Sequence, residues 1–183
     1  MSLLQPQVDA LLQPLHRGRV RQLSGNSHLE AWDIRRHLLR VFGWGGWSFE
    51  VVSCECILER SVWESEKANE THKGRHTVAY RVIGRLTIRD TEGVTLAVFE
   101  DGATGDAQNQ PGFADAHDMA LKTAMSQALK RCAINLGDRF GLSLYDKGST
   151  GAVVGRSIAH DSTVTTDASE DVEAGELDEE PAS

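Results

Sequence analysis

Apolar side chains recur every three or four residues in two parts of the chain, and every second residue in the stretch between them. The segment "SHLEAWDIRRHLLRVFG" has the helical spacing, so we expect a helix that ends at Gly43. Ser27 and Glu30 have the spacing of a capping box, which places the start of this helix directly after Ser27. A shorter helix is expected within residues 8–16, where Pro14 interrupts it.

The alternating stretch begins at Trp47 and predicts an antiparallel meander of three strands. Their sequences are "WSFEVVSCECILE", "TVAYRVIGRLTIRD" and "GVTLAVFED", and the glycine-rich "GATGDAQNQPGF" that follows is expected to be a loop. A long helix is then predicted over residues 114–136. Its Ala120, Ala124 and Ala133 leave room for another element to approach closely. The predicted fold class is α+β, a three-stranded antiparallel β-meander packed by a long helix and preceded by another helix.

The net charge of −8 is concentrated at one end of the chain. Nine of the 27 acidic residues lie in residues 157–183, which contain no Lys or Arg, so residues 1–156 carry 18 acids against 19 basic residues. A nearly neutral body can still hold a local basic stripe of the kind that binds polyanions. We therefore expect a folded binding domain over residues 1–150 and a disordered acidic tail over residues 151–183.

Composition and cysteine spacing exclude two classes of protein. No window approaches 18 apolar residues, and the N-terminus lacks a basic region followed by an apolar run, so neither a membrane span nor a secretory signal is expected. Cys54, Cys56 and Cys132 do not have the spacing of a disulfide framework, which favours a reducing compartment. We expect a cytoplasmic protein.

Lysines on the predicted long helix are the first candidates for a binding site. Lys122, Ser126 and Lys130 step by four residues and form a polar, basic stripe. At 1.5 Å per residue the two lysines lie about 12 Å apart, a separation that could span two phosphates of one nucleic-acid strand. Arg131 follows directly, and the helix contains no glutamate to pair with these cations. The alternative interpretation is a solvated helix face.

A second basic surface is expected on the middle strand. Arg81, Arg85 and Arg89 alternate with other residues along it, so one strand face carries three guanidinium groups, each able to donate two hydrogen bonds to a phosphate. An exposed sheet face paired with glutamates of neighbouring strands is the alternative. Lys73 and Arg75, in the turn before this strand, could also reach a polyanion or could simply keep the turn soluble.

Three further patterns suggest other chemistry. The tryptophans of "FGWGGW" could stack on nucleobases or form core at a tight corner. Cys54 and Cys56, together with His72 and His76, are the residue types that bind zinc, although the Cys-x-Cys spacing is short. A metal-dependent nuclease would use clustered carboxylates, for which the candidates are Asp90, Glu100, Asp101, Asp106 and Asp115.

Several of these segments together resemble a known family. "FGWGGWSFEV" after a helix, "RLTIRD", "FEDGATG" and above all "ALKTAMSQALKRCAINLGDRFGLSLYD" are similar to the Rad52/Rad22 family of single-strand annealing recombination proteins, over about residues 20–147. The resemblance implies a ring of many protomers that holds single-stranded DNA in a basic groove. It further implies annealing of complementary strands in homologous recombination and double-strand break repair, without ATP, a metal or another cofactor, and so no enzymatic activity.

The resemblance also assigns roles to individual residues. Lys130 and Arg131 match the basic pair that lines the family's groove, and Lys122 matches a basic residue two turns earlier. Arg75 falls at an outer DNA contact, and Arg85 matches an arginine of the strand.

The basic residue expected at the start of the first long helix aligns near Asp33, so Arg35 or Arg36 is expected to replace it. The length resembles a compact bacterial or phage form, with a single-strand binding protein or an exonuclease as further partners. A metal-dependent nuclease and a zinc-stabilised interaction module stay open as alternatives.

Overall fold

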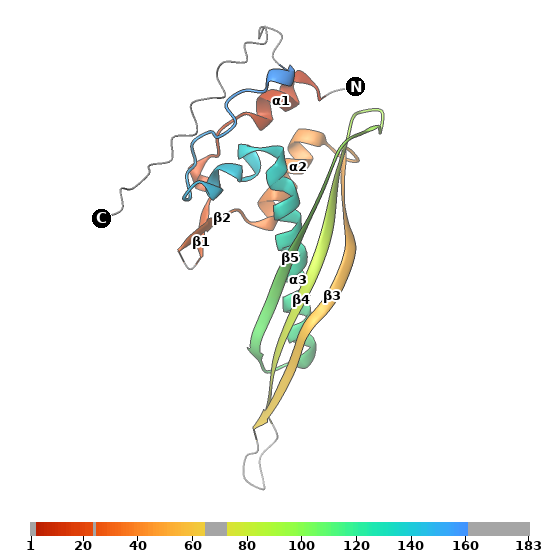
Figure 1. Ribbon diagram of the computed structural model, residues 1–183, viewed down its shortest axis with the longest axis vertical. Coiled ribbons are helices and arrows are strands. Elements are labelled where there is room, and N and C mark those ends of the chain that lie inside the picture. The colour runs from red at the N-terminus through yellow and green to blue at the C-terminus, as the bar shows by residue number, and fades with distance from the viewer. Residues whose placement is uncertain (1–2, 24, 65–72, 161–183) are drawn as a thin grey trace, which may run out of the picture.

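The computed structural model describes residues 3–23, 25–64 and 73–160, which form an elongated molecule with helices gathered at one end (Figure 1). The helices are α1 (Gln5–Leu11), α2 (Ala31–Phe42) and α3 (Phe113–Ala133), with short 3-10 helices η1 (Arg17–Arg19), η2 (Ile134–Leu136), η3 (Asp138–Phe140), η4 (Leu142–Tyr145) and η5 (Ile158–His160). The strands are β1 (Arg21–Leu23), β2 (Asn26–His28), β3 (Trp47–Glu64), β4 (Lys73–Arg89) and β5 (Thr95–Gln110).

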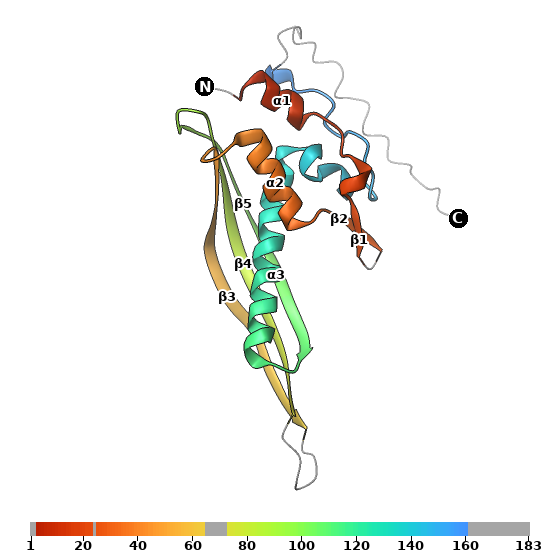
Figure 2. The same cartoon turned by 180° about the vertical axis from the view of Figure 1, so that it is seen from behind.

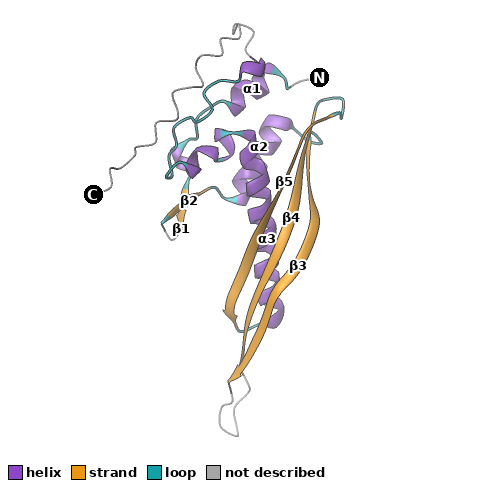
Figure 3. Ribbon diagram, viewed as in Figure 1, coloured by secondary structure: helices purple, strands orange, loops and turns teal. Residues whose placement is uncertain are grey.

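The long strands form one antiparallel sheet with β4 at its centre, and α3 lies along one face of that sheet. Figure 2 shows α3 in front of the sheet and running along it, and Figure 3 shows that the other helices gather beside one end of the sheet. The predicted α+β meander packed by a long helix, with a helix before it, is therefore confirmed. Figures 1 and 2 show no other described element over the opposite sheet face.

Small side chains set the distance between α3 and the sheet. Ala120 and Ala124 are fully buried where the helix crosses Gly105 of β5. A Cβ atom at Gly105 would meet the backbone nitrogen of Ala124 and would lie 2.7 Å from the carbonyl oxygen of Ala120. The helix backbone thus touches the strand backbone, and the close approach that the alanines predict is confirmed.

A larger core lies where the end of α3, α2 and the upper part of the sheet meet. Ile34, Leu38, Leu86, Leu129 and Phe140 have relative exposures of 1% or less. Burying a side chain of this size contributes about 1.5–3 kcal/mol. This cluster fixes the last turns of α3 against α2 and the 3-10 segment that follows the helix.

The segment predicted to be a loop after the third strand is instead part of β5. Residues 102–110 pair with β4, with Gly102 opposite Ile83 and Gly105 opposite Tyr80. The glycines that suggested a loop serve packing here, because a Cβ at Gly102 would lie 2.7 Å from the Ile83 side chain and one at Gly105 would strike α3. The contacts of this segment with β4 and α3, and not its glycine content, determine that it is a strand.

The predicted starts of the two N-terminal helices were also wrong. α2 begins at Ala31 with Glu30 as its N-cap, whereas Ser27 lies in β2, where its hydroxyl accepts a hydrogen bond from Gln22 Nε2 (2.8 Å). The first helix, α1, starts three residues and ends five residues earlier than expected, before Pro14. Ser27 pairs with Gln22 in the short β1–β2 hairpin, so it does not cap the helix.

The regular alternation predicted for the first strand is interrupted twice. The register of β3 against β4 shifts between Val51 and Ser53 and again between Cys56 and Leu58, so Val52 and Ile57 are the extra residues of two β-bulges. Each bulge reverses which residues face α3.

The end of the described chain is tied back to the body. The carboxylate of Asp138, fully buried, accepts hydrogen bonds from the backbone N–H groups of Val153 and Val154 (both 2.9 Å). The division into a domain over 1–150 and a tail over 151–183 stays a prediction, since residues 161–183 lie outside the described part. In the described part, no helix has the length and hydropathy needed to cross a bilayer.

We expect Gly105→Ala to destabilise the protein by about 1–3 kcal/mol, because the added methyl group meets helix backbone that cannot rotate away. Gly155→Ala is the matched control, since a Cβ there meets nothing within 4 Å. The midpoint of urea unfolding measures both. Equal midpoints for the two variants would contradict the close contact between α3 and β5.

Candidate nucleic-acid interface

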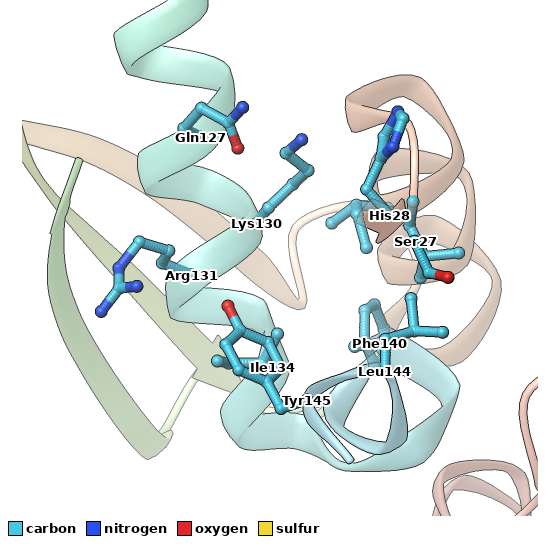
Figure 4. Close-up of a pocket in the computed structure, with 12 residues that line it drawn as sticks. Ser27, His28, Gln127, Lys130, Arg131, Ile134, Phe140, Leu144 and Tyr145 are labelled. Atoms are coloured by element: carbon cyan, nitrogen blue, oxygen red, sulfur yellow. The ribbon is translucent and has the colours of Figure 1, made fainter. Parts of the chain in front are cut away.

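A groove of about 170 Å³ opens beside the last turns of α3 (Figure 4). We call it the α3 groove. Its walls come from α3, the end of the β1–β2 hairpin with the start of α2, and the 3-10 segment η3–η4. The lining residues are Ser27, His28, Leu29, Ile34, Gln127, Lys130, Arg131, Ile134, Phe140, Gly141, Leu144 and Tyr145.

Lys130 supplies a cation to the α3 groove. Figure 4 shows its side chain extending from α3 toward the side on which His28 and Ser27 lie. The residue is half-buried and forms no hydrogen bond or ion pair with any residue in the described part of the chain. Burial lowers the pKa of Lys130, while the nearby Glu30 carboxylate acts in the opposite direction. A partly desolvated ammonium with no bonded partner gains most from binding an anion.

Arg131 is turned to the other side of α3 from Lys130 (Figure 4). Its Nε donates to Asp101 Oδ1 on β5 at 2.9 Å, and this hydrogen bond raises the pKa of Arg131. The side chain also lines a shallow depression over β5 together with Arg81 and Gln127. The Lys-Arg pair therefore divides between two neighbouring surfaces rather than pointing into one.

Lys122 lies on α3 outside the α3 groove. Its ammonium is exposed and forms an ion pair with Asp118 one turn earlier (2.6 Å). The expectation that these cations lack acidic partners is therefore wrong for Lys122 and, through Asp101, for Arg131. The prediction considered only glutamates of the helix. It therefore missed Asp118, four residues before Lys122, and Asp101, which lies on β5. Lys130, in contrast, forms no ion pair with a described residue.

The arginines of β4 have acidic neighbours on both adjoining strands. Arg81 pairs with Glu55, and Arg85 pairs with Glu100 (Nε to Oε1, 2.6 Å) and with Glu50 (Nη1 to Oε2, 4.0 Å). The alternative of an exposed sheet face paired with glutamates is confirmed for these two arginines. Exposed pairs of this kind contribute only about 0–1 kcal/mol, so they do not prevent a phosphate from competing.

The predicted hairpin cations lie far from the α3 groove. Arg75 is exposed near the start of β4, ten residues before Arg85, which corresponds to about 33 Å along a strand. Lys73 is the first residue of β4, and its side chain, like residues 65–72, lies outside the described part. Figure 1 shows the start of β4 at the end of the sheet away from α1 and α2, so Arg75, the third residue of β4, lies on a separate surface.

The arginines proposed to replace a missing basic residue are on α2 but do not line the α3 groove. Arg35 and Arg36 border a separate depression with Trp32 and Trp44, and the Arg36 guanidinium lies 5.2 Å from the Trp32 ring centroid. Trp44 is 90% exposed, whereas Trp47 packs against the core. The "FGWGGW" corner thus contains one core tryptophan and one that is free to stack.

Several groove residues carried no signal in the sequence. Ser27 and His28 enter through a hairpin of three-residue strands, too short to show alternation. Tyr145, which is 65% exposed at the groove, follows the long helix in a 3-10 turn. The chain path alone brings these residues opposite Lys130.

A buried charge cluster supports the groove from behind. Asp33, 2% exposed, pairs with Arg19, whose Nη1 donates to the carbonyl oxygen of Arg139 (2.8 Å). Arg139 Nε donates to His37 Nδ1 (3.2 Å), and Arg139 also donates to the carbonyl of Ala10 (3.1 Å). The cluster fastens the N-terminal segment, α2 and η3 together. Burial, followed by the charge of Arg19, lowers the pKa of His37 to about 4.

Neither alternative site is assembled from the candidate residues that the structure describes. His76 is buried and shares a hydrogen bond with Ser61 (2.8 Å), while His72 lies outside the described residues. Glu100 and Asp101 are engaged by arginines. Among the described residues, only one group brings three metal-ligand side chains together, and it contains none of the five carboxylates proposed for a nuclease.

Comparison with known proteins identifies the family. A family model described as Rad52/22 family double-strand break repair protein matches residues 2–161. The chain belongs to this family. Among curated relatives, DNA repair and recombination protein rad22 of Schizosaccharomyces pombe is 31% identical over 121 residues, covering 66% of this chain and 23% of the relative.

Two further fungal relatives give the same picture. The radC protein of Emericella nidulans is 33% identical over 107 residues, 58% of this chain and 16% of the relative, and RAD52 of Saccharomyces cerevisiae is 29% identical over 123 residues, 66% and 22% respectively. The matched region spans less than a quarter of the length of these relatives. The resemblance to the Rad52/Rad22 family is confirmed, and a bacterial or phage origin stays a prediction.

We expect the protein to lose stability as the pH falls from about 6.5 to about 4, partly through His37. In that window the unfolded chain takes up a proton on this imidazole and the folded protein does not, so unfolding is favoured. The full effect is on the order of 3 kcal/mol. His37→Asn, which can still accept from Arg139, should flatten the pH dependence of the urea midpoint in this window. Unchanged pH dependence would contradict the buried neutral imidazole.

Proposed function

We propose that this protein binds single-stranded DNA and anneals complementary strands in recombination and double-strand break repair. The observation that carries the proposal is Lys130, a partly desolvated cation in a groove beside α3 that has no bonded partner among the described residues, in a chain of the Rad52/22 family. Phosphate groups of a single strand are the anions that would complete its interactions.

The groove suits a nucleic-acid backbone better than a small anion. It is open along α3, and polar groups of Ser27, His28 and Gln127 lie around the ammonium. Tyr145, exposed at the groove, offers a ring on which a base can stack. Contacts of this kind read no sequence, since phosphates carry no base information.

Annealing needs the strand to be held by its backbone with base edges accessible. Cations on α3 neutralise the repulsion between two phosphate chains, and base pairing then supplies the driving energy. We therefore propose a binding protein rather than an enzyme, with no role for ATP or a metal in annealing. Arg131 can exchange its Asp101 partner for a phosphate. It then extends the basic surface from the α3 groove toward Arg81.

The sheet supports the proposal of a multi-subunit assembly. Every residue of β3 from Val51 to Val62 is exposed, among them Ile57, Leu58 and Val62 at 47%, 48% and 45%. β3 is also an edge strand, with its outer backbone groups unpaired by any other described strand. A long exposed edge carrying apolar side chains promotes pairing with another chain. We propose that further copies of this protein cover it, in a ring of many subunits.

Lys130→Ala is expected to weaken binding of a single-stranded oligonucleotide about tenfold, as for loss of one charged hydrogen bond. The slope of log affinity against log salt should fall in magnitude by about one, because one phosphate contact is lost. Fluorescence anisotropy over a salt series measures both quantities.

Arg40→Ala is the control for Lys130→Ala, since it removes an exposed cation from α2 outside the α3 groove. Lys130→Arg should retain most of the affinity. Equal affinity and salt slope for Lys130→Ala and the unchanged protein would show that DNA does not use this groove.

We expect light scattering to give a particle many times heavier than the 20.0 kDa chain. Leu58→Lys should lower that mass by placing a charge on the exposed sheet surface. Val153→Lys, at an exposed apolar residue away from the sheet, should not. A 20 kDa particle for the unchanged protein would exclude the assembly.

A further inference from the structure

A cluster of metal-ligand side chains lies at the opposite end of α3 from the α3 groove. Sγ of Cys56, a carboxylate oxygen of Glu59 and a ring nitrogen of His117 all lie within 4.8 Å of one another. His117 is in the second turn of α3, thirteen residues before Lys130, which corresponds to about 20 Å along the helix. The cluster is therefore separate from the proposed DNA contacts.

A β-bulge brings the two strand ligands together. Residues 56 and 59 would point to opposite faces of a regular strand, because side chains alternate. The register shift after Cys56 makes Ile57 the extra residue, so Cys56 pairs with Tyr80 and Glu59 with Val78. Val78 and Tyr80 both pack against alanines of α3, so they lie on the sheet face that the helix covers. Their pairing partners Glu59 and Cys56 lie on the same face and therefore also face the helix. The bulge thus creates the ligand pair that the sequence pattern did not show.

The imidazole of His117 is held in the orientation a metal ligand needs. Its Nδ1 shares a hydrogen bond with Tyr80 Oη at 2.9 Å, and Phe113 packs against the ring with centroids 4.5 Å apart. Nε2 is buried, forms no hydrogen bond with a described residue and lies 3.5 Å from Glu59 Oε2. With Nδ1–H donating to Tyr80, the lone pair of Nε2 points at the other two ligands.

From this arrangement we infer that Cys56, Glu59 and His117 bind one zinc ion per chain. Zinc–sulfur bonds of about 2.3 Å and zinc–nitrogen or –oxygen bonds of about 2.0–2.2 Å place tetrahedral ligands about 3.3–3.7 Å apart. The separation of Glu59 and His117 already fits, and Cys56 needs to move by about 1 Å at most. A thiolate, an imidazole and a carboxylate favour zinc over magnesium or calcium. Water takes the fourth position.

Zinc at this site would join the exposed edge strand to the helix. Cys56 and Glu59 belong to β3, which in the described residues pairs only with β4, and His117 belongs to α3. The ion would stabilise the part of the sheet farthest from the main core by a ligand-linkage effect that grows with zinc concentration. It takes no part in phosphate binding.

The test is metal content of the full chain after saturation with zinc and extensive dialysis, measured by elemental analysis. We expect one zinc per chain in the unchanged protein and in Cys54→Ser, whose thiol lies on the same strand but outside the cluster. Cys56→Ser, Glu59→Gln and His117→Gln should each lower zinc affinity at least tenfold. Cobalt substitution should give a thiolate charge-transfer band that Cys56→Ser abolishes and Cys54→Ser keeps.

Circular dichroism checks that each variant is folded. Because the three ligands are replaced in separate variants, the test still holds if one of them does not fold. Magnesium should not compete for the site. Zinc retained equally by folded Cys56→Ser and by the unchanged protein would overturn the assignment, as would loss of zinc in Cys54→Ser or no zinc in the unchanged protein. DNA affinity is not a readout, so this result and that for Lys130 are independent.

Discussion

The contact between the backbone of α3 and the backbone of β5 is the constraint on which the rest of the molecule depends. Ala120 and Ala124 lie against Gly105 with no room for a Cβ between them, so the backbones of helix and strand are in direct contact. The same helix carries Lys130 near one end and His117 near the other. Fixing the helix therefore fixes the position of the groove cation and of the metal-ligand cluster relative to the sheet.

Charge pairing then separates the basic residues into two groups. Arg81, Arg85 and Arg131 have carboxylate partners on the sheet, whereas Lys130 has none among the described residues. Partners on an exposed surface exchange readily for phosphate. A cation within a groove has already lost part of its hydration, so each phosphate contact that it makes contributes more binding free energy. We therefore expect most of the affinity for single-stranded DNA to come from the α3 groove. The sheet arginines extend the positive electrostatic potential around it.

Periodicity in the sequence was sufficient to predict the meander and the long helix, because both are long and strongly patterned. It failed where another element decides the local conformation. Gly102 and Gly105 suggested a loop, yet they are strand residues that leave space for Ile83 and α3. Ser27 resembled a helix cap but pairs in a hairpin.

The candidate site was predictable in part for the same reasons. Lys130 is visible as a cation on a helix without a glutamate partner, and the structure places it in a groove. His28 and Tyr145 come from segments without periodicity, and only the tertiary path brings them there. Cys56 and Glu59 share a face through a bulge, which strict alternation cannot predict.

An image reconstruction of the protein with a bound single-stranded oligonucleotide tests the central claim most directly. The account predicts a continuous backbone in the α3 groove, with a phosphate within hydrogen-bond distance of Lys130 Nζ and the base edges accessible to a second strand. A strand bound only over the sheet face at Arg81 and Arg85, with the groove of Lys130 empty, would contradict it.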